Sequence, residues 1–402
     1  MYIKLGFRNI LRNKKRSLLA GLAIGVGLAA LIFIDAFFIG IFDNMIRNIT
    51  DSYLGHGQIH HKEFLQTLEI DKTIQNPQKI LLKLSNNPDI QTATPRVMSV
   101  GMVSSAEDAK NIMIIGILPD KEKKVSQVAE QIIDGKFVSS EQDIILGKRL
   151  TDSLGVSVGD RVVLTASQKD SGELSQELFR VTGIFKMGTK EMDEKMAIIH
   201  IKKAQRLLSL SDNFHELAFR FHDKSKVDSI KFWQNLTTGT NEALSWKKLA
   251  PGIESFISLN KSMRGIISII LLALVSLGIM NTLFMSLYER LFEFGVLRAL
   301  GTRSLTLILT VLSEAAALSF ISIILGSIIA LTLGIILSIV GIDYTGIELA
   351  GVTFREKIYV VLTWQQFVRY PIMIFCFTLL VSLYPSIHAT KITLGKALKK
   401  TL

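Results

Sequence analysis

Apolar residues along the chain are concentrated in four long runs, which mostly polar sequence separates. An α-helix needs about 20 consecutive apolar residues to cross the hydrocarbon core of a bilayer. The four runs occupy residues 18–42, 265–287, 305–340 and 371–387. This pattern predicts an α-helical membrane protein with four transmembrane helices, and it argues against an ordinary soluble enzyme.

Three of the runs carry further information. The first ends in F-F-I-G-I-F-D-N, which lacks the cleavage site of a signal peptide, so a retained helix is expected. The third run is longer than one bilayer crossing requires. We expect its span proper at residues 315–340, with a cytoplasm-side extension or a strongly tilted start at 305–314. The fourth run is short, and Trp364 and Tyr370 precede it as interfacial anchors.

The charge distribution predicts the topology. The 402 residues include 46 Lys and Arg against 35 Asp and Glu, a formal net charge of +11. Residues 43–264 are nearly neutral, and the basic excess lies beside the apolar runs, which is the positive-inside pattern and not a groove for nucleic acid. We therefore expect residues 1–17, 288–304 and 388–402, and so both termini, in the cytoplasm. Residues 341–370 form a short outer loop, although it also contains basic residues, Arg355, Lys357 and Arg369.

The neutral segment, residues 43–264, is the predicted extracytoplasmic domain, inserted between the first two spans. Its short alternating segments and turn residues indicate an α+β fold, which we expect to form two small lobes. Strands are expected at residues 56–61, 97–103, 112–118, 180–185 and 216–221, a strand followed by a helix at 143–154, and a helix at 202–210.

The chain lacks the motifs of a stand-alone enzyme. Neither G-x-x-x-x-G-K-[ST] nor G-x-S-x-G occurs. The single cysteine, Cys376, excludes an intramolecular disulfide and a thiolate zinc site built from one chain. His56, His60 and His61 invite a metal interpretation, but no carboxylate stands at ligand spacing, and a polar strand face explains them better. We expect no catalytic residue, no metal and no cofactor bound by this chain.

The segment between the second and third spans, residues 288–304, is too polar to span a membrane and too apolar for a free loop. As a helix it places Phe294, Leu297, Leu300 and Gly301 near one face. Charge is supplied by Glu289, Arg290, Glu293 and Arg298. Two interpretations follow: a connector lying on the lipid interface, or an amphipathic helix that docks into another protein.

Small and ionisable residues mark positions inside the apolar runs. Gly21 and Gly25 form a G-x-x-x-G pair in the first span, where helices can approach closely. This face meets a partner permease, flanks a lipid cavity, or packs within the chain. Asp35 and Glu314 are the ionisable residues of the runs and are functional candidates, although a partner at the interface explains both without chemistry.

The segment at 288–304 resembles that of the FtsX-like, or MacB-like, permeases of ABC transporters, which carry E-R-x-x-E-I-G-x-L-R-A-x-G at this position. The matching positions are Glu289, Arg290, Glu293, Gly295, Leu297, Arg298, Ala299 and Gly301. Phe294 departs from the aliphatic residue usual there. Residues 7–16, 145–164, 179–193 and 384–392 are also similar to the family, and the lipoprotein-releasing (LolC/LolE type) permeases are the most similar subgroup.

The resemblance implies the fold and partners of a type VII ABC transporter in the cell inner membrane. Two permeases, which are copies of this chain or relatives, pair with two ATPase subunits that bind ATP and Mg²⁺. The link at 288–304 contacts the ATPase through the matching residues and Phe294. Nucleotide-driven closure is transmitted to the outer domains by mechanotransmission, so this chain is non-catalytic.

The resemblance leaves the substrate open. The first alternative is release of lipoproteins from the inner membrane to a periplasmic chaperone. The second is MacB-like export of small molecules or peptides with a periplasmic adaptor and an outer-membrane channel. The third is regulation of a cell-wall hydrolase, which usually accompanies a smaller outer domain.

Overall fold

The computed structural model describes residues 14–236, 239–349 and 352–391. The chain divides into two compact units. Unit 1 comprises residues 1–43, 257–343 and 357–402, and unit 2 comprises residues 44–256 and 344–356. Most of the predicted basic start at 1–17 and of the basic tail at 388–402 lies outside the described residues.

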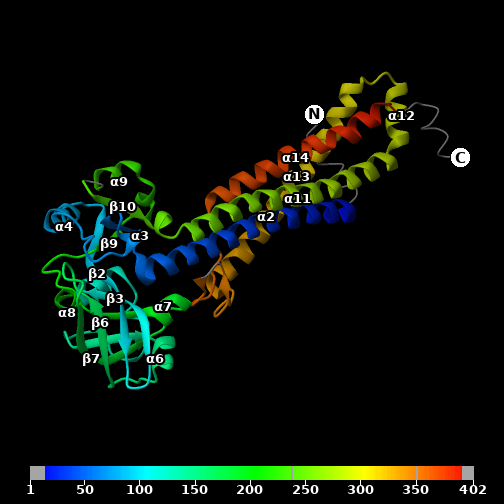
Figure 1. Cartoon of the computed structure of the whole chain (residues 1–402). Helices are drawn as coiled ribbons and strands as arrows, with labels where there is room; N and C mark the ends of the chain where they lie inside the picture. Colours follow the sequence, from blue (N-terminus) through cyan, green and yellow to red (C-terminus); the bar gives the residue numbers. More distant parts are fainter. Residues whose placement is uncertain (1–13, 237–238, 350–351, 392–402) are drawn as a thin grey trace. The chain divides into compact units, whose positions relative to one another are not determined.

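Long helices dominate unit 1 (Figure 1). They are α2 (Lys14–Ile49), α11 (Pro251–Glu289), α13 (Ser304–Val340) and α14 (Trp364–Lys391), with the short α12 (Leu291–Ala299) between α11 and α13. Within the described residues, these four long helices are the ones long and apolar enough to cross a membrane. The predicted class, a membrane protein with four transmembrane helices and an α+β extracytoplasmic domain, is confirmed.

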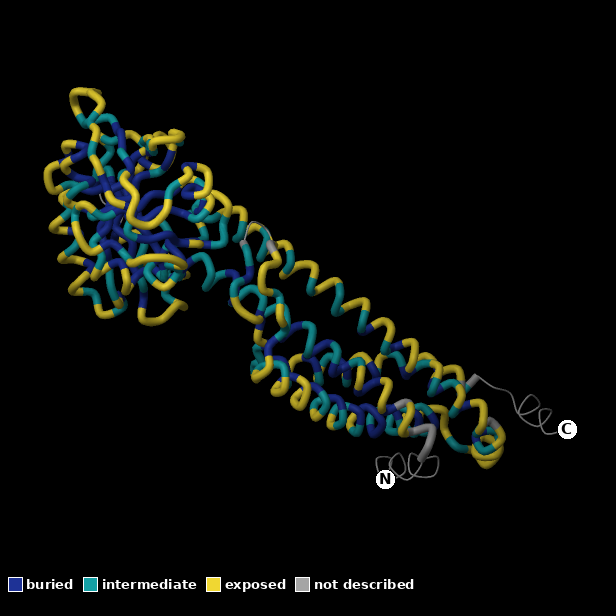
Figure 2. The backbone as a smooth tube through the Cα atoms, turned by 90° about the horizontal axis from the view of Figure 1, so that it is seen from below, coloured by how far each residue is buried: buried dark blue, intermediate teal, exposed yellow. Residues whose placement is uncertain are grey.

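The four long helices share one apolar core. Ile32 of α2, Ile279 of α11, Leu318 of α13 and Ile374 of α14 are all buried in it. Many other large apolar side chains of the same helices are exposed, and Ile339 of α13 is 73% exposed. Figure 2 shows this contrast between buried and exposed positions along the helices. Exposed apolar side chains of this extent suit contact with lipid. The backbone of these helices can also lie in lipid, because its polar groups form hydrogen bonds within each helix.

The helices differ in their limits from the predicted spans. α11 begins at Pro251 and α14 at Trp364, whereas the apolar runs begin at 265 and 371. The start of α14 has a local cause, because the Gln366 side chain accepts a hydrogen bond from the Thr363 main-chain N–H at 2.9 Å, which is half of a capping box. α13 is one continuous helix that includes residues 305–314. The composition predicts which part of a helix is apolar, whereas capping interactions determine the residue at which the helix begins.

Unit 2 is built around one ten-stranded mixed sheet (Figure 1). The strands are β1 (Gly57–His61), β2 (Ile90–Ser104), β3 (Ala109–Ile117), β4 (Ile132–Gly135), β5 (Asp143–Gly147), β6 (Arg161–Ser167), β7 (Leu174–Phe185), β8 (Met196–His200), β9 (Glu216–Phe221) and β10 (Asn241–Ser245). Six of them form a closed path of hydrogen bonds, β2-β3-β8-β5-β7-β6 and back to β2. Strands β9, β1 and β10 extend the sheet beyond β2.

One sheet runs through the whole of unit 2, and its division into two small lobes stays a prediction. One edge of β2 pairs with β9 over residues 90–96 and with β6 over residues 101–104. The 15-residue strand is therefore long enough to serve both the closed path and the extension. Strand lengths within a sheet depend on distant partners, which local patterns do not reveal.

Short helices and the outer loop complete unit 2. The helices are α3 (Phe64–Thr67), α4 (Pro77–Ser85), α5 (Pro119–Val125), α6 (Lys148–Leu154), α7 (Lys190–Lys195), α8 (Ile201–Leu207), α9 (Ile230–Leu236), α10 (Trp246–Leu249) and the 3₁₀ turn η2 (Lys224–Asp228). A π-helical turn, η1 (Thr50–Leu54), directly follows α2. The predicted loop 341–370 contains the hairpin β11 (Glu348–Leu349) and β12 (Val352–Thr353), which belongs to unit 2.

Candidate functional site

The predicted link is a short helix with one side buried against unit 1. Phe294 of α12 is 5% exposed and packs in a cluster with Leu287 of α11 and with Leu307 and Val311 of α13. Gly301 has φ +87°, a left-handed conformation that suits glycine and turns the chain toward α13. Phe294 and Gly301 therefore fix the position of α12, because one anchors it and the other ends it.

This burial corrects the predicted face of the link. Phe294 and Leu297 were expected near one face, but Leu297 is 40% exposed and Leu300 is 78% exposed. The Arg298 guanidinium is exposed and donates a hydrogen bond to the Thr390 main-chain oxygen of α14. The apolar side chains that α12 and its C-cap expose thus include Leu297 and Leu300, together with Phe292 and Val296, and Phe294 faces inward.

A polar cluster at the base of the link joins three predicted site residues. Arg290 donates from Nη1 to Glu314 Oε2 at 3.0 Å and from Nε to Glu293 Oε2 at 2.9 Å. Ser286 Oγ donates to the other oxygen of Glu314 at 3.0 Å. The Arg290 and Glu314 side chains are mostly buried, so their pairing is screened less than a surface pair. Glu314 therefore ties α13 to the junction of α11 and α12.

The link residues Glu289 and Gly295 lie outside the polar cluster described above. Glu289 is the exposed last residue of α11, and it takes part in an interaction within the chain. Gly295 lies beside Phe294 in α12 and is half-buried. Their contribution to partner binding stays a prediction.

Asp35 is the centre of a second polar cluster, which joins three helices. It is 7% exposed and forms an ion pair with Arg264 of α11, with 3.1 Å between Oδ1 and Nη1. Gln366 of α14 donates to Asp35 Oδ2 at 2.9 Å, and the Tyr370 hydroxyl interacts with Asp35 and Ser268. Sequence reasoning found Asp35 but not its partners. The available signal was Arg264, the basic residue directly before the second apolar run.

Gly21 and Gly25 pack against α13 of the same chain. A Cβ atom on Gly25 would lie 3.1 Å from the Ser322 main-chain oxygen and 3.2 Å from the Gly326 nitrogen. A Cβ atom on Gly21 would lie 3.4 Å from Ser322 Oγ. The structure thus supports intrachain packing for this face, with a matching glycine, Gly326, on the facing helix. Contact of the same face with a partner permease or a lipid cavity stays a prediction.

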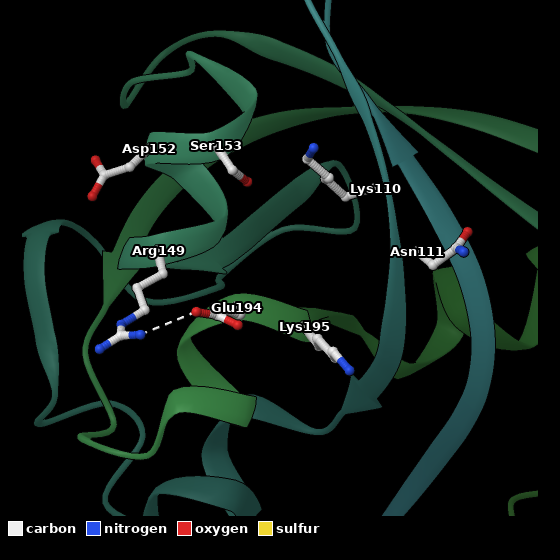
Figure 3. Close-up of a pocket in the computed structure, with 7 residues that line it drawn as sticks. All are labelled: Lys110, Asn111, Arg149, Asp152, Ser153, Glu194 and Lys195. Carbon is white, nitrogen blue, oxygen red and sulfur yellow. Dashed lines mark hydrogen bonds and ion pairs between the residues drawn. The ribbon is translucent and has the colours of Figure 1, made fainter.

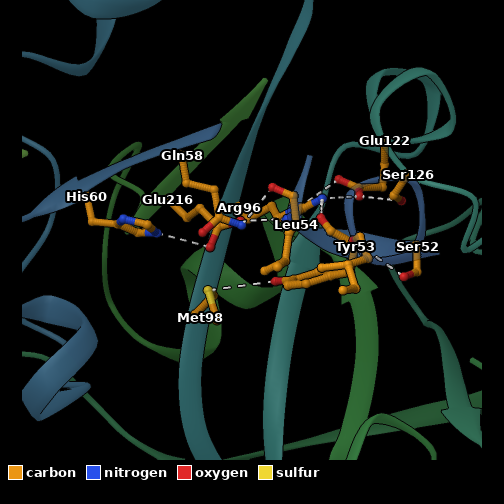
Figure 4. Close-up of polar contacts among 11 residues, drawn as sticks. Ser52, Tyr53, Leu54, Gln58, His60, Arg96, Met98, Glu122, Ser126 and Glu216 are labelled. Atoms are coloured by element: carbon orange, nitrogen blue, oxygen red, sulfur yellow. Dashed lines mark hydrogen bonds and ion pairs between the residues drawn. The ribbon is translucent and has the colours of Figure 1, made fainter. Parts of the chain in front are cut away.

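Unit 2 contains a buried ionic network that sequence reasoning missed (Figure 4). Arg96 of β2 is fully buried and forms a bidentate ion pair with Glu122 of α5, with distances of 3.0 and 2.6 Å. Its Nη1 atom donates to Glu216 of β9 at 2.5 Å, and the other oxygen of Glu216 lies 3.2 Å from His60 Nε2. Arg96 also donates to the main-chain oxygen of Tyr53 in η1 at 2.8 Å. One arginine thereby connects the π-helical turn to two strands and a helix.

The electrostatics of the network favour its charged form. Burial opposes ionisation of Glu216, but Arg96 and His60 outweigh it and hold the pKa of Glu216 below its usual value. Burial, followed by the charge of Glu216, raises the pKa of the Tyr53 phenol well above its usual value. A buried network of this kind is stable only while every member keeps its partner.

The three histidines of the metal hypothesis are separated by their contacts. His56 Nδ1 accepts a hydrogen bond from the Phe221 N–H at 3.0 Å, and His60 contacts Glu216. Among the described residues, no group of three or more His, Cys, Asp or Glu side chains could hold a metal ion. The polar face of this strand is therefore used for contacts within the sheet.

One surface depression of unit 2 is also lined by polar and charged residues. It measures about 710 Å³ and lies between β3, α6 and α7 (Figure 3). Arg149 pairs with Glu194 across it at 3.0 Å, while Lys110 pairs with Asp108 at 2.6 Å. The charges are thus paired with one another, as is usual for a solvent-exposed protein surface.

Comparisons with known proteins agree with the motif at 288–304. The profile of the FtsX-like permease C-terminal family matches residues 265–394, and that of the MacB-like periplasmic core domain matches residues 17–232. The chain is similar to the lipoprotein-releasing system transmembrane protein LolC of Neisseria meningitidis serogroup B, with 28% identity over 53% of this chain and 50% of that protein. It is similar to the corresponding LolE of Haemophilus influenzae, with 24% identity over 49% of each. The matches thus span about half the length of these relatives.

Among solved structures, the periplasmic region of MacB from Actinobacillus actinomycetemcomitans aligns with 52% of this chain and 95% of that chain. The TM-score is 0.36 and the identity is 13%. The family resemblance inferred from the motifs, including the LolC/LolE subgroup, is confirmed by the profiles and the relatives.

Proposed function

The chain belongs to the family that joins a MacB-like periplasmic core domain to an FtsX-like permease C-terminal region, and from this membership we propose that it is the membrane subunit of an ABC transporter that releases lipoproteins. The names of the relatives, lipoprotein-releasing system transmembrane proteins, support this substrate. Acylated proteins leave the inner membrane and pass to a periplasmic chaperone. The chain itself is non-catalytic, and ATP and Mg²⁺ bind the partner ATPase.

The observation that carries the proposal is the geometry of α12. Its inner side is anchored by Phe294, and its outer side presents Leu297, Leu300 and the exposed Arg298. A helix fixed in this way suits a rigid contact with a cytoplasmic ATPase, because exposed apolar side chains rimmed by charge are typical of protein interfaces. We therefore propose that residues 1–17, 288–304 and 388–402, and so both termini, lie in the cytoplasm.

The continuity of the long helices supports the proposal of mechanotransmission. α2 runs without a break from Lys14 to Ile49, and η1 continues it to Tyr53, which Arg96 connects to the sheet of unit 2. A displacement of the cytoplasmic ends can pass along such helices without opening a channel. A second permease, which is another copy of this chain or a relative, completes the transporter.

The test is purification of the tagged full chain from its native membrane in mild detergent, with identification of the proteins that accompany it. We expect an ATPase subunit together with acylated lipoproteins. An ATPase with a periplasmic adaptor and an outer-membrane channel favours MacB-like export. An ATPase with a cell-wall hydrolase favours the regulatory alternative. Absence of any ATPase contradicts the proposal.

A pair of matched variants tests the role of α12. Leu297→Ser with Leu300→Ser is expected to reduce recovery of the ATPase at least tenfold while the chain still inserts into the membrane. Charge reversal by Glu293→Lys with Arg298→Glu is expected to act in the same direction. Leu259→Ser, at a position of α11 that is 67% exposed, is the control and leaves recovery unchanged.

A further inference from the structure

A half-open pocket of about 530 Å³ lies within unit 2, and we name it the junction pocket. Its walls come from the end of α2 with η1, the start of α7, the start of α11 and the outer loop after β12. Ile49 comes from α2, Ile253 from α11 and Arg355 from the loop after β12. Helices α2 and α11 contain candidate membrane spans, and α14 follows the segment of Arg355 along the chain. The pocket therefore lies where the chain passes between the membrane and the outer domain.

One part of the junction pocket is apolar. It is lined by Ile49, Leu54, Met187, Met192 and Ile253. Met187 is fully buried beneath the pocket, and methionine adapts its shape to irregular ligands. The volume is in the range of small-molecule sites and is large enough for a glycerol unit with the first methylenes of two acyl chains.

The other part contains a cation without a close counter-ion. Arg355 lines the pocket and is only partly exposed, and no described carboxylate forms an ion pair with it. Asp193 is near enough to interact electrostatically, but its two oxygens accept the N–H groups of Met187 and Gly188, at 2.6 and 3.3 Å. Burial lowers the pKa of Arg355, and the charge of Asp193 only partly opposes this effect. Such a guanidinium gains from an anionic ligand.

A second polar group in the pocket lacks a partner. The Thr189 Oγ1 atom is buried, and among the described residues it makes no hydrogen bond. A buried hydroxyl without a partner is unfavourable, so native proteins rarely keep one without a use. Lys190 and Glu191, which also line the pocket, carry opposite charges, and this leaves Arg355 as the net charge of the lining.

We propose that the junction pocket binds an anionic membrane phospholipid, with its phosphate held by Arg355 and Thr189 and its glycerol and first methylenes against the apolar wall. A guanidinium donates two parallel hydrogen bonds to a phosphate, and a hydroxyl adds a third. The location beside the membrane-spanning helices favours a lipid over a soluble anion. The site does not depend on the proposed transport reaction.

The test uses the delipidated full chain in a neutral maltoside detergent. Dihexanoylphosphatidylglycerol is titrated, and binding is followed by native mass spectrometry and by the thermal midpoint, which rises when a ligand binds the folded state. Two further probes separate the sources of the chemistry: dihexanoylglycerol, which has the same chains without phosphate, and inorganic phosphate alone. We expect one saturable site for the phosphatidylglycerol and much weaker binding of both other probes.

Variants connect the binding to the named residues. Arg355→Gln is expected to weaken lipid binding at least tenfold, and Arg355→Lys, which keeps the charge, about threefold. Thr189→Val is expected to weaken binding about threefold without lowering the thermal midpoint of the lipid-free protein, because it removes an unpaired hydroxyl. Arg149→Gln, at an exposed arginine of the same unit, is the control and leaves binding unchanged.

The alternatives give distinct results. Equal binding of dihexanoylglycerol, or of the phospholipid to Arg355→Gln, overturns the proposal because the phosphate contact is then absent. Equal binding of inorganic phosphate reduces the site to one for free anions and overturns the lipid assignment. A lowered thermal midpoint in lipid-free Thr189→Val means that the hydroxyl serves the fold, which removes it from the site.

Discussion

The guanidinium carbon of Arg96 lies 4.0 Å from the centroid of the Tyr53 ring, and the same guanidinium donates to the main-chain oxygen of Tyr53. Tyr53 belongs to the π-helical turn η1 that follows α2, and Arg96 lies in β2, which serves both parts of the sheet. π-Helical turns frequently occur at functional positions. The contact therefore fixes the point where the first membrane helix becomes part of the outer domain.

Replacement of Arg96 by Met is expected to destabilise unit 2. The variant leaves Glu122 and Glu216 buried without their cation, and breaking a buried ion pair costs about 3–5 kcal/mol. The measurement is hydrogen–deuterium exchange of the full chain, followed in peptides that cover η1, β2 and α5. We expect faster exchange in these peptides by at least tenfold.

Arg161→Met is the matched control, because Arg161 is an exposed arginine at the start of β6 in the same unit. It is expected to leave exchange in η1 and α5 unchanged. Equal exchange in the Arg96 variant and the wild type would show that the ionic network contributes little to the fold.

Two buried histidines make the stability of unit 2 dependent on pH. Burial, followed by the charge of Arg220, lowers the pKa of His56 to about 4, and burial lowers that of His215 to about 4. Because the unfolded chain binds these protons with a pKa of 6.5, stability is complete above pH 6.5 and falls as the pH drops toward 4. For His215 the loss is about 1–2 kcal/mol by pH 5.

The measurement is the rate of hydrogen exchange in peptides covering β1 and β9, between pH 7 and pH 5, after correction for the intrinsic pH dependence of exchange. His215→Gln is expected to reduce the pH slope of the corrected stability, and His222→Gln, at an exposed position, is expected to keep it. An unchanged slope in His215→Gln would remove this histidine as a source of the acid sensitivity.

Local patterns in the sequence predicted those elements that depend on local residues. The strand and helix at 143–154 correspond to β5 and α6, and the link at 288–304 contains α12. The two polar clusters in unit 1 were only partly visible. Asp35 and Glu314 are conspicuous in apolar runs and Arg290 belongs to the family motif, but Arg264 is ordinary at the end of its run, and neither ion pair was predicted. A partner is set by helix packing, which composition does not reveal.

The buried network of unit 2 was out of reach for a related reason. Arg96, Glu122 and Glu216 are charged residues of ordinary appearance that come from separate elements, and the sheet topology brings them together. The inward orientation of Phe294 was also missed. Two positions near the same helix face differ in burial when only one of them packs against α13. Contacts between residues far apart in the sequence could thus be identified only from the three-dimensional structure.

Gly25→Ile is expected to separate α2 from α13. A Cβ atom there already lies 3.1 Å from a main-chain oxygen of Ser322, and backbone cannot move aside as a side chain can. Overpacking of this kind costs about 1–3 kcal/mol. The thermal midpoint of the full chain in detergent should fall by several degrees.

Gly278→Ile is the control for this substitution. Gly278 also lies inside a membrane helix, α11, but no atom lies within 4 Å of the Cβ position. The control should keep the thermal midpoint. If both variants melt alike, helix propensity and not the α2–α13 contact determines the effect.

Glu314→Gln is expected to weaken ATP-driven activity more than folding. The amide keeps the shape and can still accept from Ser286, but it lacks the charge that pairs with Arg290. The base of α12 then loses its ion pair to α13, while the apolar anchor at Phe294 remains. If the proposed transporter is reconstituted with its ATPase, we expect a several-fold lower ATP-dependent release rate, with a loss of stability of about 1 kcal/mol.

A charge swap distinguishes the pair from either residue alone. Glu314→Arg combined with Arg290→Glu restores opposite charges across the same contact and should recover part of the release rate, whereas Glu314→Arg alone places two cations together and should lower it further. Ser286→Ala is the control for the neutral hydrogen bond and should have a small effect, because it leaves the ion pair intact. Normal turnover of Glu314→Gln would assign the pair to the fold of unit 1 and exclude it from coupling.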